Sequence, residues 1–218
     1  FASHVIMFDV QLDRAVRRVT EPIAEIMYSV LLRELDYAQD YDIAELEIEL
    51  EGEGRLADFV SAVARLSREG GEPVRQAASV PITLPGVSAD DYGVWQRVRI
   101  GAQRRPRASA ALHAINPATY PSADTWAASL RGEGDITIRI LVDRTFELAA
   151  RRRPRHAIIF IVDEVGAYVA RSAEKIENLR AVVELFGKES KNRVQAGKAV
   201  APVWVIVTSQ EKLDEVVA

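Results

Sequence analysis

An uninterrupted apolar run that ends in two acidic residues constrains this chain more than any other stretch. Residues 157–162 read Ala-Ile-Ile-Phe-Ile-Val and lead directly into Asp163 and Glu164. An apolar run without polar alternation is typical of a strand that is buried on both faces of a parallel sheet. Similar short runs occur at residues 5–8 and 203–207. Three such strands favour an α/β fold with a mostly parallel sheet.

Helical periodicity fills much of the sequence between these strands. Apolar residues recur at helical spacing in residues 23–35, 56–66, 138–148 and 176–186. The residues after the third strand, 211–217, have a helical pattern as well. We therefore expect helices to flank the sheet.

The middle of the chain has a looser pattern. Between residues 72 and 134, prolines divide short segments, and only residues 90–99 resemble a helix. On this basis we predict three segments. Residues 1–71 carry the first strand and helices of a core, residues 72–134 form an insertion of short helices and loops, and residues 135–218 carry the other two strands with their flanking helices.

The composition of the chain excludes several classes of protein. The formal net charge of -4, from 28 basic and 32 acidic residues, provides no overall basic field for binding nucleic acid or anionic lipid. The chain has no cysteine for disulfides or thiolate metal sites, and its three histidines are scattered without metal-ligand spacing. No apolar run reaches the roughly 20 residues that a membrane-spanning helix needs. We therefore predict a cytoplasmic protein without a membrane segment.

The residues at the end of the second strand point to phosphate chemistry. A buried parallel strand delivers its first polar residues to the carboxyl edge of the sheet, where α/β proteins bind ligands. An apolar strand that ends in Asp-Glu matches Walker B, the second nucleotide motif of P-loop ATPases. Asp163 would hold Mg²⁺ through its water shell, since Mg²⁺ takes one or two protein carboxylates and keeps most of its waters. Glu164 would orient and deprotonate the water that attacks the γ-phosphate of ATP.

A second polar group follows the third strand. Thr208, Ser209 and Gln210 come directly after residues 203–207, and they resemble the γ-phosphate sensor that such ATPases place on the strand beside Walker B. Polar residues at strand ends also cap the next helix, so these residues and Asp163-Glu164 have a purely structural alternative. Two strands with polar ends favour the ATPase interpretation.

The phosphate-binding loop of a P-loop ATPase is absent from this sequence. Gly-x-x-x-x-Gly-Lys-Ser/Thr occurs nowhere, and Gly187-Lys188-Glu189-Ser190 is only a fragment that follows a helical segment. The chain starts at Phe1 without an initiator Met and enters the first strand almost at once. We therefore expect a piece of a longer protein whose phosphate loop precedes Phe1, and no ATP hydrolysis by this piece alone.

Two groups of arginines have competing explanations. A solvated helix end and loop explain the first group better than contact with phosphate does, and this group consists of Arg97, Arg99, Arg104, Arg105 and Arg107. The second group, Arg151 to Arg153, stands in a last helical turn, where basic side chains offset the helix dipole. An ATP-sensing arginine in the second group is the weaker alternative.

Four segments in the last third of the chain carry a family resemblance, and they are Arg152–Pro154, Ile161–Ser172, Lys175–Glu184 and Val205–Glu215. They resemble the BrxC/PglY P-loop ATPases of BREX bacteriophage-resistance systems. The resemblance implies an AAA-like core that uses ATP and Mg²⁺ and works in the cytoplasm with other BREX defence proteins, including a methyltransferase, around DNA. By position, Asp163 and Glu164 correspond to Walker B, and Thr208 to Gln210 correspond to the sensor region.

Three hypotheses remain open from the sequence. The chain belongs to an ATPase core that drives conformational change in a complex, or to a degenerate ATPase fold that serves as a scaffold, or to an unrelated α/β binding module with acidic helix caps. In AAA-like sheets the strand with the phosphate loop lies beside the sensor strand. If the phosphate-loop strand is absent, the sensor strand becomes an open edge that can pair with another strand. We therefore expect self-association into a homo-oligomer or completion by another segment of the intact protein.

Overall fold

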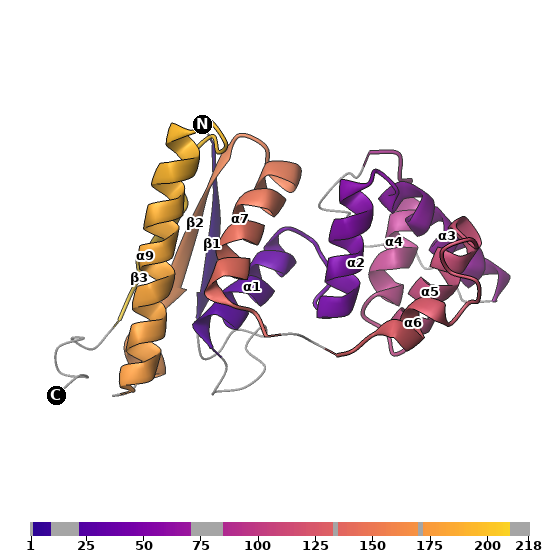
Figure 1. Ribbon diagram of the computed structural model, residues 1–218, viewed down its shortest axis with the longest axis horizontal. Coiled ribbons are helices and arrows are strands. Elements are labelled where there is room, and N and C mark those ends of the chain that lie inside the picture. The colour runs from indigo at the N-terminus through magenta and orange to yellow at the C-terminus, as the bar shows by residue number, and fades with distance from the viewer. Residues whose placement is uncertain (1, 10–21, 71–84, 133–134, 170–171, 210–218) are drawn as a thin grey trace. The chain divides into compact units, whose positions relative to one another are not determined.

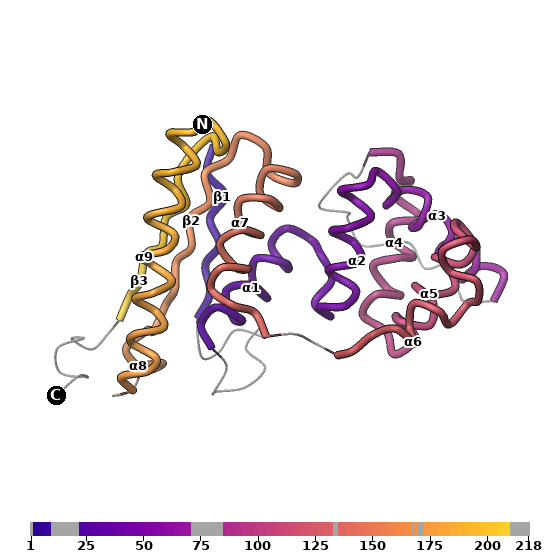
Figure 2. The backbone as a smooth tube through the Cα atoms, in the orientation of Figure 1, coloured from indigo at the N-terminus to yellow at the C-terminus, as the bar shows by residue number. Residues whose placement is uncertain are grey.

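The chain forms two compact units (Figure 1). The structure is a computed structural model that describes residues 2–9, 22–70, 85–132, 135–169 and 172–209. The sheet unit comprises Phe1–Leu35 and Asp135–Ala218, and the helical unit comprises Asp36–Gly134. Figure 2 traces the backbone as a tube, in which the residues of the helical unit interrupt those of the sheet unit once. The helical unit is therefore an insertion in the chain of the sheet unit.

The sheet unit has the coarse fold that the sequence predicts. Its strands are β1 (Ala2–Asp9), β2 (His156–Asp163) and β3 (Trp204–Val207). Its helices are α1 (Ile23–Glu34), α7 (Ile138–Arg152), α8 (Val165–Val169) and α9 (Ala173–Gln195). The unit is thus a small parallel three-stranded sheet flanked by helices, which confirms the α/β class. The helical pattern at residues 211–217 lies outside the described residues.

The three strands lie in the order β1-β2-β3, and both neighbouring pairs are parallel. In the central strand β2, Ile159 lies opposite both Val5 of β1 and Trp204 of β3. At the other end of the same strand, Asp163 lies opposite Asp9. The prediction that the three apolar runs form strands of a parallel sheet is confirmed. Among the residues that the structure describes, no strand lies beyond β3, so this edge of the sheet is open.

One face of the sheet is buried, and we call it the inner face. Five alternating side chains on β1 and β2 are buried there, and they are Ile6, Phe8, Ile158, Phe160 and Val162. Helix α9 contacts both α1 and α7, which also contact each other. The ring of Phe186 on α9 lies 5.7 Å from the ring of Phe160. The three long helices of the unit therefore cover one and the same face.

The outer face is apolar as well, but no described helix covers it. It presents Val5, Met7, Trp204 and Ile206, whose exposed fractions are 47%, 60%, 58% and 46%. Because Val5, Ile159 and Trp204 are neighbours in register, these side chains form one continuous surface. Parallel sheets in α/β proteins normally have both faces covered. The sheet unit thus has one covered face and one bare face within the described residues.

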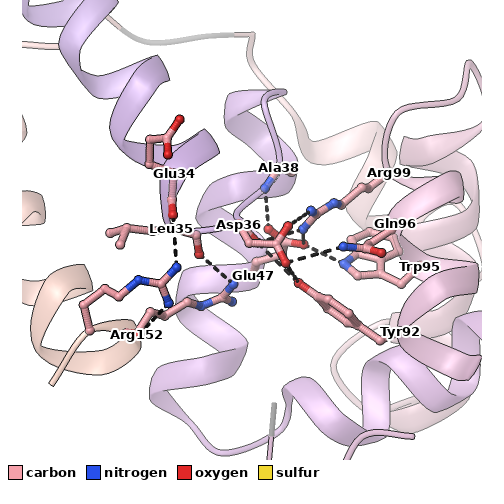
Figure 3. Close-up of polar contacts among 11 residues, drawn as sticks. Glu34, Leu35, Asp36, Ala38, Glu47, Tyr92, Trp95, Gln96, Arg99 and Arg152 are labelled. Atoms are coloured by element: carbon pink, nitrogen blue, oxygen red, sulfur yellow. Dashed lines mark hydrogen bonds and ion pairs between the residues drawn. The ribbon is translucent and has the colours of Figure 1, made fainter. Parts of the chain in front are cut away.

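Helix α7 begins and ends where the sequence predicts. The hydroxyl of Thr137 accepts a hydrogen bond from the Ile140 amide at 3.2 Å and caps the start of the helix. The helix ends before Pro154, which disfavours a helical residue ahead of it. Arg152 is buried and donates to the carbonyl of Leu35 at 3.1 Å (Figure 3). Arg152 therefore holds α7 against the end of α1, which gives this member of the arginine run a structural role.

The helical unit is built from five short helices among its described residues. These are α2 (Tyr41–Gly52), α3 (Leu56–Glu69), α4 (Ala89–Val98), α5 (Arg104–Ile115) and α6 (Thr125–Ser129). Helix α3 contacts both α4 and α5, and the rings of Phe59 and Trp95 meet edge to face at 5.0 Å. In the described part of both units, no helix is long and apolar enough to cross a membrane.

A buried polar cluster joins α2 to α4 in the helical unit (Figure 3). Glu47, which is 1% exposed, accepts hydrogen bonds from the Ala38 amide at 2.6 Å, the Trp95 indole at 2.5 Å and Arg99 at 3.0 Å. Arg99 also donates to Asp36 at 2.5 Å. Burial lowers the pKa of Arg99, but the charges of Glu47 and Asp36 outweigh this effect and raise it overall. Arg99 is therefore a structural cation.

Other members of the first arginine group also have carboxylate partners. Arg104 donates to Asp40 at 2.6 Å, and Arg105 pairs with both Asp40 and Asp42, at 3.1 and 2.8 Å. These ion pairs connect the start of α5 to the start of α2. The structural explanation of this group thus holds for the members with these contacts, although the arginines are paired with acids rather than merely solvated.

The helical unit differs from the segments that the sequence predicts. It starts at Asp36, whereas the sequence places the insertion at residues 72–134 and assigns residues 36–71 to the first segment. The pattern does not predict α2, because Leu46, Ile48 and Leu50 alternate with glutamates at a period of two. It does not predict α5 either, because Pro106 reads as a break. The structure places Pro106 in the first turn of α5, where proline is tolerated.

Candidate functional site

Polar residues from adjacent strands meet at the carboxyl edge of the sheet. Strand β2 ends at Asp163, which lies in register with Asp9 at the end of β1. Thr208 follows β3 directly and bonds to β2 through its backbone amide, which donates to the Val162 carbonyl at 3.0 Å. The structure therefore brings together Asp163 and Thr208, which are 45 residues apart in the sequence.

The carboxylate of Asp163 is held by two hydrogen bonds to the same oxygen. Its Oδ1 accepts one from the amide of Glu164 at 3.0 Å and another, short one from the hydroxyl of Thr208. Its Oδ2 accepts no hydrogen bond from the residues that the structure describes. Because one oxygen is fixed, the rotation of the carboxylate is fixed and the other oxygen has a defined direction.

A backbone hydrogen bond fixes the start of α8 against the end of β3. The amide of Val165 donates to the carbonyl of Thr208 at 3.0 Å. Glu164 therefore lies between two anchored neighbours, since Asp163 belongs to β2 and Val165 bonds to Thr208. This arrangement holds the backbone of the acidic pair in one conformation.

Glu164 has a left-handed backbone conformation with a φ of 57°. For a residue with a Cβ this conformation costs about 1 kcal/mol or more, and it occurs where the surrounding structure imposes it. The half-buried side chain of Glu164 forms no hydrogen bond or ion pair with described residues. Its carboxylate thus lies at the edge of the sheet without a partner among the described residues.

The remaining residues of the predicted sensor are only partly described. The hydroxyl of Ser209 is buried and has no hydrogen-bond partner among the described residues. Gln210, the third predicted sensor residue, lies outside the described residues. Of the three predicted sensor residues, Thr208 is the one that contacts Asp163 in the part of the chain that the structure describes. The sequence does not predict that Asp9 lies beside Asp163, although the end of the first strand at an acid is the signal for it.

The described residues suit part of an ATP and Mg²⁺ site. No cluster of three or more metal-ligating side chains occurs in the described ranges. Mg²⁺ does not need such a cluster, because it takes one or two carboxylates and retains its waters. Oδ2 of Asp163, which has no hydrogen-bond donor among the described residues, could accept from one of these waters. The phosphate groups of ATP require a backbone nest and a lysine, and the sequence lacks that loop. The edge thus fits the metal and water side of the site, without the phosphate cradle.

Comparisons with known proteins do not assign the chain to a family. No family model matches the sequence. No solved structure matches the fold.

Proposed function

We propose that this chain forms part of the ATP-hydrolysing core of an AAA-like P-loop ATPase related to the BrxC/PglY proteins of BREX defence systems. The observation that carries the proposal is the contact between Asp163 and Thr208 at the carboxyl ends of adjacent parallel strands. A Walker B strand beside a sensor strand requires this pairing. A chance pair of helix caps would not need the two strands to be neighbours.

Each residue of the edge has a role in the proposed site. Bound Mg²⁺ would neutralise charge on the phosphates of ATP. Asp163 accepts from water through Oδ2, while Thr208 fixes the carboxylate through Oδ1. Glu164, whose carboxylate has no described partner, orients a water and takes its proton. Positioning of this kind dominates catalysis of phosphoryl transfer.

The direction of the strand connections supports the proposal independently. The crossovers from β1 to β2 and from β2 to β3 advance in the same direction across the sheet. The right-handed rule places their helices on one face, which agrees with the contacts among α1, α7 and α9. A further strand beside β3 that precedes β1 in the chain would need a crossover in the reverse direction, and the helix of that crossover would cover the bare face. The carboxyl end of this further strand would lie next to Thr208.

The test compares binding of labelled ATP with Mg²⁺ by this chain and by a version extended upstream. We expect binding by the extended protein only, because the phosphate cradle is missing here. Asp163→Ala should weaken binding in Mg²⁺ by about tenfold or more, and Glu164→Gln should retain binding and abolish hydrolysis. Asp90→Asn, a change at an exposed acid in the helical unit, serves as the matched control. A folded, extended protein that binds no ATP would contradict the proposal.

The bare outer face favours a second candidate function. An exposed apolar surface that spans three strands is typical of an interaction site. If the extended protein binds no nucleotide, the fold acts as a scaffold that docks another element on this face. The wider setting, a cytoplasmic complex that includes other BREX proteins, a methyltransferase and DNA, rests on the sequence resemblance and belongs to the proposal.

A further inference from the structure

A pocket opens at the amino-terminal end of the sheet. The end of α7, the turn before β2 and the connection from α9 to β3 form its walls. Phe146, Ile158 and Val203 contribute apolar side chains, whereas Arg153, Arg155, His156 and Lys198 contribute basic ones. No aspartate or glutamate is among its described lining residues. The described lining of the pocket therefore combines apolar and basic residues.

The cations of this pocket have unused hydrogen-bond donors. Arg155 and Lys198 are exposed and have no ion pair or side-chain hydrogen bond with described residues. The guanidinium of Arg153 is held by His4 at 3.4 Å and by the carbonyls of Arg152 and Glu34 at 3.0 and 3.5 Å. Since a guanidinium has five N–H donors, these three contacts orient it and leave two donors.

The turn that presents Arg155 uses a residue type that the backbone disfavours. The amide of His156 donates to the carbonyl of Arg153 at 3.1 Å, which closes a four-residue turn. Pro154 takes the second position and Arg155, with a φ of 68°, the third. This is a type II turn, whose third position favours glycine. Arginine is thus held at a strained position with its charge beside the pocket, and strain of this kind occurs at binding sites.

We propose that this pocket binds the phosphate group of a ligand through Arg153, Arg155 and Lys198. Three positive charges, with no acid among the described lining residues, suit a dianion with several acceptor oxygens better than a single carboxylate. Phe146 and Val203 would contact an apolar or aromatic substituent next to the phosphate. A volume of about 190 Å³ accommodates a phosphate with a small substituent.

This phosphate pocket is separate from the proposed ATPase edge. It lies at the His156 end of β2, whereas the ATPase edge lies at Asp163. An extended strand rises about 3.3 Å per residue, so the two ends are roughly 23 Å apart. Binding at the two places can therefore be measured independently, and the phosphate pocket does not depend on the proposed function.

The test is a titration of the isotope-labelled chain with inorganic phosphate, in EDTA and at constant ionic strength, followed through backbone amide NMR signals. We expect saturable shifts in residues 153–158 and 198–201. Arg155→Gly should weaken binding by about tenfold, because a charge-assisted contact is lost. The same change should leave the melting temperature unchanged or raise it, since glycine relieves the strained turn. An effect on binding without loss of stability would separate a ligand role from a structural one.

Controls determine whether the effect is local. Lys198→Gln should also weaken phosphate binding, whereas Arg180→Gln, which removes an exposed charge on α9 outside the pocket lining, should not. A parallel titration with short oligothymidylate distinguishes a nucleic-acid phosphate, which would bind more tightly than inorganic phosphate, from that of a small molecule. Linear shifts spread over all surface cations, or equal affinity in Arg155→Gly, would overturn the proposal.

Discussion

Replacement of Glu47 tests whether the buried polar cluster holds the helical unit together. Glu47→Ala leaves the amide of Ala38 and the indole of Trp95 without their acceptor and removes one of the two carboxylates beside Arg99. Loss of one partner from a buried ion pair costs about 3–5 kcal/mol, so we expect a loss of about 4 kcal/mol in the free energy of unfolding. Glu47→Gln keeps an acceptor and removes only the charge, so we expect about 2 kcal/mol.

Urea unfolding followed by tryptophan fluorescence measures these losses, because Trp95 is fully buried whereas Trp204 is largely exposed. Glu69→Ala is the matched control. Glu69 forms an exposed pair with Arg65 in the same unit, and its removal should cost less than about 1 kcal/mol. If Glu47→Ala is as mild as this control, or if the glutamine and alanine variants lose the same stability, the cluster does not act as inferred from its contacts.

Three further predictions concern titration and the bare face. Burial, and then the charge of Arg153, lower the pKa of His4, so the unfolded chain binds a proton at this residue more readily than the folded chain does. The sheet unit should therefore lose stability as the pH falls below about 6.5, and His4→Gln should lose less. Burial raises the pKa of Asp40, but hydrogen bonds, that of Arg104 first, outweigh it and lower the pKa overall. The ionised carboxylate of Asp40 therefore contributes to the free energy of unfolding above about pH 4, and this contribution is lost as the pH falls through the pKa of the folded state. Asp40→Asn should make the free energy of unfolding depend less steeply on pH in the acid range. An unchanged dependence would contradict this. Met7→Lys should reduce binding of the dye ANS at constant secondary structure, and undiminished dye binding would place the exposed apolar surface elsewhere.

The sheet was predictable because its strands are defined by composition alone. The runs at residues 5–8, 157–162 and 203–207 are apolar throughout, and all three form neighbouring parallel strands. Their side chains read as buried on both faces of the sheet. In β1 and β2, however, the structure buries the side chains of one face only, and no side chain of β3 is fully buried. Sequence periodicity reports which faces are apolar, and the direction of the crossovers decides which of these faces receives helices.

The helical unit was less predictable because its stability depends on contacts between distant residues. Glu47 looks like one of several surface acids on an acidic helix, yet it is buried by Trp95 and Arg99, which lie 48 and 52 residues later. No local pattern distinguishes it from Glu45 or Glu49. The sequence likewise predicts Arg99 to be solvated with its neighbouring arginines, because its partners Glu47 and Asp36 come from the segment that the sequence assigns to a different region.

A strained backbone conformation occurs at each end of β2. Among the described residues other than glycine, positive φ occurs at Asp36, Arg155 and Glu164. At Asp36 the structure contains the interaction that accompanies the strain, because its carboxylate accepts from Arg99 and from Tyr92. Aspartate also tolerates this conformation better than arginine or glutamate does. The charged side chains of Arg155 and Glu164 have no described partner, although each conformation would be relieved by glycine. The two proposed sites each require a charge directed toward a bound ligand at these residues. If these roles hold, Glu164→Gly and Arg155→Gly should each preserve or raise stability while removing a catalytic or a binding property.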